Sequence, residues 1–271
     1  MVVFPNCKIN LGLNITRKRT DGYHDLETIF YPVQLRDALE LIQSKEQTFT
    51  ITGLPVQGSV DDNLCSKAYN LLKKDFPHLP TVSIHLHKAI PMGAGLGGGS
   101  ADGAFTLLLI NKKFNLGLDQ KQLINYALQL GSDSPFFIIN KPSFATGRGE
   151  NMTPVNLDLS TYKIVLVNPG IHVSTKEAFS QLTPAMPQKS IQQIIAQPIS
   201  TWKDELVNDF EKPIFSLYPA IEQIKNQLYQ AGSMYAAMTG TGSTVFGIFD
   251  VTAEPNLTFP TTYLNITIPA L

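Results

Sequence analysis

Apolar and polar residues alternate near the amino terminus, and this period of two is typical of a β-strand. One face of the predicted strand carries Ile9, Leu11, Leu13 and Ile15. The other face carries Lys8, Asn10 and Asn14. Shorter extended segments over 26–33, 38–42 and 48–51 predict that the first part of the chain is rich in β-structure.

The period changes to that of a helix after residue 61. Leu64, Ala68 and Leu72 recur at helical spacing and predict a helix over 62–74, with Asp61 or Asp62 as its cap. Alternation over 82–86 then predicts a strand, which ends near Pro91. The apolar run over 101–111 predicts a buried helix capped by Ser100, and Asp119 is expected to cap another helix that continues to residue 130.

The carboxy-terminal half alternates between the two periods. We expect strands over 163–168 and 263–268, helical stretches over 208–231 broken at Pro213 and Pro219, and a strand, glycine-rich turn and strand over 236–249. A polar stretch between residues 144 and 162 is the expected domain boundary. The prediction is therefore a mixed α+β protein with domains over 1–150 and 151–271.

Composition narrows the class of protein. The 271 residues are 43% hydrophobic, with 21 Lys and Arg against 22 Asp and Glu. This balance excludes a disordered tail protein and a purely electrostatic nucleic-acid binder. Two cysteines are too few for a disulfide framework or a zinc quartet, and no apolar stretch approaches the ~20 residues that cross a bilayer. We expect a cytoplasmic protein without nucleic-acid or membrane partners.

A glycine-rich segment carries the clearest chemical signal. Five of the seven residues 93–99 are glycine, and they stand between a predicted strand and a predicted helix. Such a backbone approaches a ligand closely, and the N–H groups of the following helix favour an anion, above all phosphate. The alternative is a tight turn that binds nothing, but the density of glycine favours phosphate binding.

Two familiar phosphate motifs fit this loop poorly. Gly93, Gly95 and Gly98 match the dinucleotide fingerprint, and Asp119 follows at roughly the 20 residues that it requires. Asp119, however, opens a predicted helix instead of ending a strand. A Walker loop ends in Gly-Lys-Ser/Thr, whereas this loop ends in Gly-Ser-Ala at residues 99–101 and has no lysine.

The loop over 91–101 resembles the ATP loop of the GHMP kinases, a family of small-molecule kinases. Three more blocks are similar to that family in order and spacing: Lys8 to Asn14 followed by Asp21-Gly-Tyr-His24, Gly131 to Phe137, and Met238 to Phe246. The resemblance implies an amino-terminal ATP-binding domain, a carboxy-terminal α+β domain and an active site in the cleft between them.

The Asp21-Gly-Tyr-His24 block is typical of one branch of the family. That resemblance implies ATP-dependent phosphorylation of the 2-hydroxyl of 4-diphosphocytidyl-2-C-methyl-D-erythritol, giving the 2-phosphate and ADP, in the non-mevalonate route to isoprenoid precursors. It also implies Mg²⁺ with ATP, and we expect a monomer or a weak homodimer. Two alternatives stay open: another GHMP kinase, such as a homoserine or mevalonate kinase, and a catalytically silent nucleotide-binding regulator.

The resemblance also implies the site residues. Asp133 would be the general base and Lys8 would polarise the hydroxyl or the γ-phosphate; the alternative for Asp133 is a helix cap. Ser100 would be a magnesium ligand. The residues implied to contact ATP are Asn63, Pro91, Met92, Gly93, Ala94, Gly95, Leu96, Gly97, Gly98, Gly99, Ser100 and Ala101. Those implied to contact the substrate are Asn10, Tyr23, His24, Thr175 and Phe179, with an aromatic face stacking on the cytosine.

Other candidate residues have weaker signals. Lys67 and Lys88 are plausible contacts of the adenine end by family position. His85 and His87 alternate along one strand, but no third ligand recurs nearby, so a solvated strand face is the preferred interpretation. Gly240 and Gly242 are expected either to let the carboxy-terminal backbone approach the phosphate region or to form a simple hairpin turn.

Overall fold

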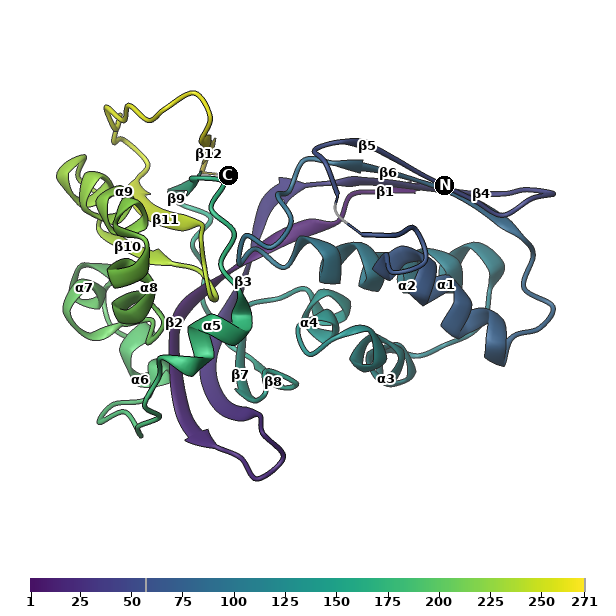
Figure 1. Ribbon diagram of the computed structural model, residues 1–271, viewed down its shortest axis with the longest axis horizontal. Coiled ribbons are helices and arrows are strands. Elements are labelled where there is room, and N and C mark those ends of the chain that lie inside the picture. Colours follow the sequence, from purple (N-terminus) through teal and green to yellow (C-terminus); the bar gives the residue numbers. More distant parts are fainter. Residues whose placement is uncertain (57, 271) are drawn as a thin grey trace. The chain divides into compact units, whose positions relative to one another are not determined.

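The structure is a computed structural model that describes residues 1–56 and 58–270 (Figure 1). It divides into two compact units that are interleaved along the chain. Unit 1 comprises Met1–Lys8, Pro32–Met92 and Gly97–Lys141, and unit 2 comprises Ile9–Tyr31, Gly93–Leu96 and Pro142–Leu271. This differs from the single division after residue 150, because long-range strand pairing assigns residues 9–31 to unit 2.

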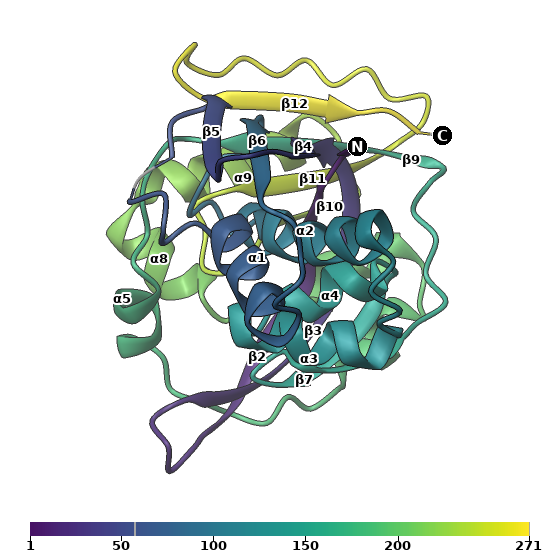
Figure 2. The ribbon, with the colours of Figure 1, turned by 90° about the vertical axis from the view of Figure 1, so that its right-hand side faces the viewer.

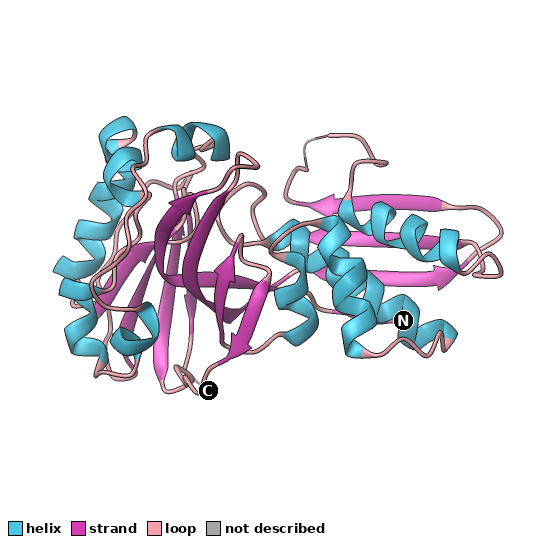
Figure 3. Cartoon of the chain, turned by 90° about the horizontal axis from the view of Figure 1, so that it is seen from below, coloured by secondary structure: helices cyan, strands magenta, loops and turns pink. Residues whose placement is uncertain are grey.

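Unit 1 is built on a sheet with the strand order β1 (Val2–Val3), β4 (Ala38–Gln43), β6 (Val82–Lys88) and β5 (Thr48–Gly53). Strand β5 pairs with β6 in parallel, and the other pairs are antiparallel. Alternate residues of β4 and β6, such as Leu39 and Leu86, are fully buried. The helices lie along one face of this sheet (Figures 1 and 3), so the period of two in these strands marks a single buried face.

The helices of unit 1 are α1 (Leu64–Asp75), α2 (Gly98–Phe114), α3 (Gln120–Leu130) and α4 (Ser134–Ile139). Asp119 caps α3 through a reciprocal capping box with Gln122, so the prediction for α3 is confirmed. The prediction that Asp61 or Asp62 caps α1 is wrong. Asn63 is the cap, and its side-chain oxygen accepts the N–H of Cys65 at 2.9 Å. Three adjacent polar residues all suit a cap, and packing decides among them.

Helix α2 begins earlier than predicted. Its first residue is Gly98, preceded by Gly97 in the left-handed conformation at φ 70°, so the prediction that Ser100 caps this helix is wrong. Glycine is a poor helix former, which made Ser100 the natural start in the sequence. Burial of Gly98, Ala101, Ala104 and Leu107 against unit 1 outweighs that propensity. Ser100 therefore lies within the first turn of α2.

The first sheet of unit 2 has the order β2 (Asn6–Lys18), β3 (His24–Arg36), β7 (Ser143–Gly147) and β8 (Asn151–Pro154). Strand β2 is buried on both faces from Asn6 to Ile15, so its polar residues are as enclosed as its apolar ones. Strands β7 and β8 form an antiparallel hairpin within the stretch that was predicted to link two domains. Some of the polar residues there form the turn of this hairpin.

The second sheet of unit 2 has the antiparallel order β10 (Tyr235–Met238), β11 (Val245–Asp250), β9 (Tyr162–Asn168) and β12 (Leu264–Ile268) (Figure 2). Helices α8 (Glu211–Leu217) and α9 (Pro219–Gln230) contribute Ile214, Ile224 and Leu228 to the core of this unit. The predicted break at Pro219 is confirmed, since α8 ends at Leu217 and α9 begins at Pro219. Pro213 does not break a helix, because it lies in the first turn of α8, where no intrahelical N–H is needed.

Short helices complete unit 2: α5 (Thr175–Ser180), α6 (Ile191–Ile195), α7 (Trp202–Glu205) and the 3₁₀ turn Ile199–Thr201. Trp202 is fully buried and packs edge-on against Tyr235. Within the residues that the structure describes, no helix has the length and apolar character needed to span a bilayer.

Candidate active site

Lys8 and Asp133 form an ion pair in unit 1. Lys8 stands near the start of β2 and Asp133 directly precedes α4, and the Lys8 Nζ lies 3.6 Å from the Asp133 Oδ2. The lysine side chain is 4% exposed, whereas the aspartate side chain is 38% exposed. Burial lowers the pKa of Lys8, and the opposite charge of Asp133 acts against that shift. The Asp133 carboxylate is therefore open to solvent, whereas the Lys8 ammonium that pairs with it is buried.

The pair lies beside the start of α2. A Cβ atom placed on Gly97 would lie 3.2 Å from both Cγ and Cε of Lys8, so the lysine stem packs directly on the residue that precedes α2. Asp133 occupies the cap position of α4, but within the described residues its side chain makes no cap hydrogen bond. The alternative interpretation of Asp133 as a simple helix cap therefore loses support.

The first turn of α2 presents backbone N–H groups next to this pair. The first intrahelical bond runs from the N–H of Ala101 to the carbonyl of Gly97 at 2.9 Å. The N–H groups of Gly98, Gly99 and Ser100 precede it and have no partner within the helix. Together with the partial positive charge of a helix start, they make an anion site. Ser100 is half-buried in this turn.

The middle of the glycine-rich loop is held within unit 2. The Thr239 hydroxyl lies 3.1 Å from the Gly95 carbonyl, and the Thr244 N–H donates to the Ala94 carbonyl at 3.3 Å. A Cβ on Gly240 would lie 3.3 Å from the Cα of Gly95. Gly240 lets the carboxy-terminal backbone approach Gly95 closely, and it also lies in the hairpin turn between β10 and β11, so both expected features are present. Phosphate binding by the loop stays a prediction.

Asn10 is buried and bonded inside unit 2. Its N–H donates to the Thr239 hydroxyl at 3.0 Å, its Nδ2 donates to the Thr28 hydroxyl at 3.1 Å, and its Oδ1 lies 3.1 Å from the same Thr239 hydroxyl. Asn10 thus connects β2 to the turn that holds Gly95. The implied contact of Asn10 with a substrate stays a prediction.

The predicted aromatic contacts of the substrate are brought together in unit 2. The rings of His24 and Phe179 stack at 4.8 Å between centroids with 23° between planes, and Phe179 meets Phe210 edge-on at 4.9 Å. Burial and the charge of Lys18 lower the pKa of His24. Tyr23, beside His24, is 56% exposed and carries the Arg148 guanidinium 4.7 Å above its ring. A planar base has aromatic faces to stack on here.

The remaining predicted contacts lie in two places. Thr175 is exposed at the first position of α5, four residues before Phe179. In unit 1, Asn63, Met92 and Gly99 line one small cavity of about 100 Å³, together with Lys88 and Asp102. Three residues implied to contact ATP are thus gathered around one cavity, whereas Lys67 is exposed and pairs with Asp62 at 3.4 Å.

A buried charge network in unit 1 was not predicted. The Lys88 ammonium bonds the Asp37 Oδ2 and lies 2.7 Å from the Asp102 Oδ2, and all three side chains are at most 3% exposed. Burial lowers the pKa of Lys88, but the two carboxylates outweigh it and the pKa is raised. Burial raises the pKa of Asp102 to about 8. The one available sequence signal was an aspartate at the start of an otherwise apolar helix.

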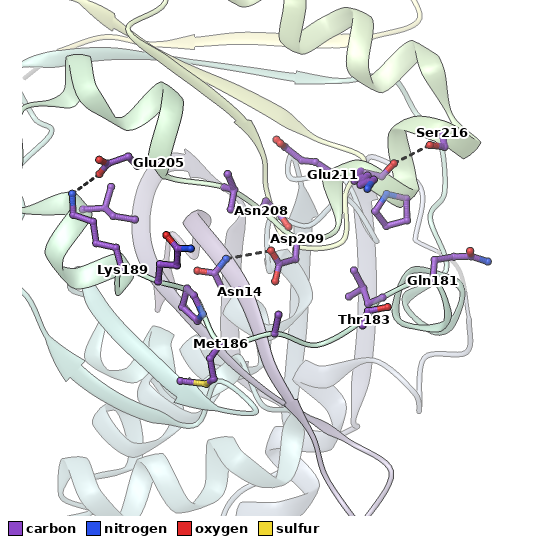
Figure 4. Close-up of a pocket in the computed structure, with 18 of the residues that line it drawn as sticks. Asn14, Gln181, Thr183, Met186, Lys189, Glu205, Asn208, Asp209, Glu211 and Ser216 are labelled. Carbon is purple, nitrogen blue, oxygen red and sulfur yellow. Dashed lines mark hydrogen bonds and ion pairs between the residues drawn. The ribbon is translucent and has the colours of Figure 1, made fainter.

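A larger cavity of about 1000 Å³ lies in unit 2 (Figure 4). Asn14, Met186, Lys189, Glu205 and Asp209 are among its lining residues, and Figure 4 shows two internal pairs, Asn14 with Asp209 and Lys189 with Glu205. The residues that line it include none of the predicted contacts of ATP or substrate. The size of this cavity alone does not make it the reaction site.

Among residues 1–56 and 58–270, no group of three or more His, Cys, Asp and Glu could hold a metal ion. His85 and His87 lie on an exposed strand face, each 2.9 Å from the Thr52 hydroxyl, as expected of a solvated face. Mg²⁺ bound with a nucleotide needs only one or two protein oxygens beside the phosphates, and the half-buried Ser100 hydroxyl suits that requirement.

An anion-binding helix start with a lysine and a solvent-facing carboxylate beside it defines a phosphotransferase-like site. Comparison with known proteins agrees with this class. The family described as GHMP kinases N terminal domain matches residues 63–141, and the family described as GHMP kinases C terminal matches residues 190–256. The two matched segments fall on either side of residue 150.

Individual relatives indicate which branch of the GHMP kinases the chain resembles. The chain is 54% identical to the 4-diphosphocytidyl-2-C-methyl-D-erythritol kinase of Bacteroides fragilis over 253 residues, 92% of each chain. A crystal structure of 4-(cytidine 5'-diphospho)-2C-methyl-D-erythritol kinase has a TM-score of 0.80 at 31% identity, covering 92% of this chain and 90% of that one. The mevalonate kinase of Methanococcus jannaschii has a TM-score of 0.69 at 12% identity, covering 93% and 92%, and shares the fold alone.

The chain therefore belongs to the GHMP kinases and, within them, to the 4-diphosphocytidyl-2-C-methyl-D-erythritol kinase family. The predicted fold class, a two-domain α+β GHMP kinase fold, is confirmed.

Proposed function

We propose that this protein transfers the γ-phosphoryl group of ATP to the 2-hydroxyl of 4-diphosphocytidyl-2-C-methyl-D-erythritol, releasing ADP and the 2-phosphate on the non-mevalonate route to isoprenoid precursors. The observation that carries the proposal is the Lys8–Asp133 pair, 3.6 Å apart, against the glycine that precedes α2. It combines a cation, a carboxylate and an anion-binding helix start in one place.

The catalytic roles follow from these positions. Phosphoryl transfer asks a protein mainly for positioning and charge neutralisation. The N–H groups of the first turn of α2 bind the phosphates, and Asp133 accepts the proton of the attacking 2-hydroxyl. The bond between the hydroxyl oxygen and phosphorus forms as the bond from phosphorus to the ADP oxygen breaks. Lys8 offsets the negative charge that gathers on the transferred group.

In such a reaction, Asp133 and Lys8 contribute late along the reaction coordinate, when the bond to the ADP oxygen is already largely broken. In a loose transition state the hydroxyl keeps its proton until bond cleavage is advanced, so orientation by Asp133 matters as much as its basicity. The magnesium ion that accompanies ATP would neutralise phosphate charge, and we propose the Ser100 hydroxyl as its protein ligand. No other step is assigned to the metal.

Recognition of the cytidine end is assigned to unit 2. Tyr23 and Phe179 would stack on the cytosine, and His24 would bond its edge. The structure has His24 stacked on Phe179, so the base would join or replace an existing aromatic contact. We further propose Thr175 and Asn10 as contacts of the rest of the substrate.

The test is ADP production, measured with a coupled assay, from ATP with each of three acceptors. We expect turnover with 4-diphosphocytidyl-2-C-methyl-D-erythritol and none with homoserine or mevalonate. Asp133→Asn serves as the inactive control in the same assay. Turnover with one of the other alcohols alone would assign the protein to another GHMP activity. ADP release with no acceptor of the panel, despite measurable ATP binding, would favour the silent regulator.

A further inference from the structure

We propose that the buried network of Asp37, Lys88 and Asp102 is a positioning device that clamps the two ends of the phosphate loop and thereby sets the affinity for ATP. The inference rests on the proposed use of residues 91–101 as the phosphate loop. The three residues belong to unit 1. Lys88 is a plausible contact of the adenine end by family position, but its side chain is fully buried between the two carboxylates, and neither Asp37 nor Asp102 has an implied contact.

The network holds the residues just ahead of the loop. The Asp37 Oδ1 accepts the backbone N–H groups of Ala89 at 2.6 Å and Ile90 at 2.8 Å. These are the last two residues before Pro91, where the loop begins. The other carboxylate oxygen of Asp37 accepts from the Lys88 ammonium. The Asp37 side chain therefore holds the backbone at the start of the loop and also binds the Lys88 ammonium.

The same network holds the residues just after the loop. The Lys88 ammonium donates to the Asp102 Oδ2 at 2.7 Å, and Asp102 is the fifth residue of α2. The chain of bonds thus runs from Ala89 and Ile90 through Asp37 and Lys88 to α2. It joins the two ends of a loop across its base.

Apart from the bonds that Ala94 and Gly95 accept from Thr244 and Thr239, the glycines of the loop leave its backbone with few side chains to define its shape. Gly93, Gly95 and Gly97 all have positive φ, at 64°, 77° and 70°, and carry no side chains that could lock the backbone by packing. Such a segment loses much conformational entropy when it is ordered. Fixing its ends before the ligand arrives removes part of that loss from the binding step, which is the usual route by which preorganisation raises affinity.

The charged groups of the network indicate a role beyond filling the core of unit 1. Two carboxylates share one ammonium in a fully buried place, and the Asp102 Oδ1 has no hydrogen-bond partner among the described residues. Buried ion pairs are weak contributors to stability relative to apolar side chains of similar volume. Because such a buried ion network adds little stability, the geometry that it imposes on the loop explains its presence better than stability does.

The test compares Asp102→Ala, which removes the oxygen that bonds Lys88, with Asp102→Asn, which keeps one. Binding of the non-hydrolysable analogue AMP-PNP with Mg²⁺ is measured by calorimetry without any acceptor, so the result does not depend on the identity of the substrate. Because a loop misplaced by about 1 Å costs up to about a hundredfold in function, we expect Asp102→Ala to weaken AMP-PNP binding by at least about tenfold. Asp102→Asn should stay within about threefold of the wild type.

Leu72→Ala is the matched control for stability. Leu72 is fully buried in α1, so the substitution leaves a cavity and lowers the melting temperature without touching the network. We expect its affinity for AMP-PNP to be unchanged. At saturating ATP, the KM of the alcohol substrate should be unchanged in folded Asp102→Ala, since the proposed contacts of that substrate lie outside the loop.

Two results would overturn the proposal. One is wild-type affinity for AMP-PNP in folded Asp102→Ala. The other is equal weakening in Leu72→Ala, which would reduce the network to a general stabiliser. If Asp102→Ala does not fold, Asp37→Asn provides the second test, because an amide nitrogen facing Lys88 breaks the link while the amide oxygen still accepts from Ala89 and Ile90. It is expected to weaken AMP-PNP binding to the same extent, and unchanged binding would contradict the inference.

Discussion

The Lys8 ammonium lies 3.6 Å from the Asp133 carboxylate, and only the carboxylate is open to solvent. The two residues are far apart in the sequence, and each alone has an ordinary explanation as a strand lysine or a helix cap. Their meeting beside Gly97 places a carboxylate and a cation at the start of α2. This relationship gives the most direct prediction.

We expect Asp133→Asn and Lys8→Ala each to lower kcat by about two to four orders of magnitude, the range for loss of a general base or a charge-stabilising group. ATP binding should stay largely intact, because the backbone of α2 is unchanged. Steady-state kinetics and AMP-PNP calorimetry on the purified variants measure both effects. Lys121→Ala, on the exposed surface of α3, is the matched control and should keep wild-type turnover. Near-normal turnover in either test variant would contradict the assignment.

The pH dependence of turnover should report the lowered pKa of Lys8. Burial is the main cause of that shift. In the proposed mechanism the charged form of Lys8 is the one that offsets phosphate charge. The ammonium loses its proton as the pH rises through this lowered pKa, so kcat should fall on the alkaline side below about 10.5, the value of an ordinary lysine. A kcat profile measured from neutral to pH 10 checks this. A flat profile over that range would show that Lys8 is not the group that titrates.

Gly95→Ala should abolish tight ATP binding. A Cβ at residue 95 would lie 2.1 Å from the Thr239 carbonyl oxygen, and the φ of 77° already disfavours any side chain. The loop must shift, and AMP-PNP affinity should fall by at least about tenfold, since a misplacement of about 1 Å is that costly.

Gly117→Ala is the control for Gly95→Ala, because it introduces backbone strain without a steric clash. Gly117 has a φ of 72°, but no heavy atom of the described residues lies within 4 Å of the added Cβ. It should lower stability by about 1 kcal/mol with unchanged AMP-PNP affinity. Equal loss of affinity in both variants would mean that the close approach of Thr239 to Gly95 is not what shapes the loop.

Tyr23→Ala and Phe179→Ala should raise the KM for 4-diphosphocytidyl-2-C-methyl-D-erythritol by about fivefold to a hundredfold, because stacking on a base is worth about 1–3 kcal/mol. The KM for ATP should not change. Phe4→Ala is the control for Tyr23→Ala, since Phe4 is an aromatic residue of unit 1 with 55% exposure against 56% for Tyr23. An unchanged KM for the cytidylylated substrate in both test variants would show that the cytidine pocket lies elsewhere.

The sequence alone predicted features that depend on near neighbours. The alternation around Ile9 and Leu11 predicted β2, the capping residue Asp119 predicted α3, and the glycines of residues 93–99 predicted an anion-binding turn before a buried helix. The motifs around Lys8, His24 and Phe137 predicted the family. These signals are local because strand period, helix caps and glycine geometry are set by residues a few positions apart.

Tertiary structure decided what depends on contacts between distant segments. It moved the start of α2 from Ser100 to Gly98, gave residues 9–31 to unit 2, and gathered Asp37, Lys88 and Asp102 into one buried network. Packing energy outweighs the low helix propensity of glycine at α2, and pairing between strands far apart in the chain follows no local period. The 3.6 Å between Lys8 and Asp133 is of the same kind, since only the folded chain brings a strand and a helix start together.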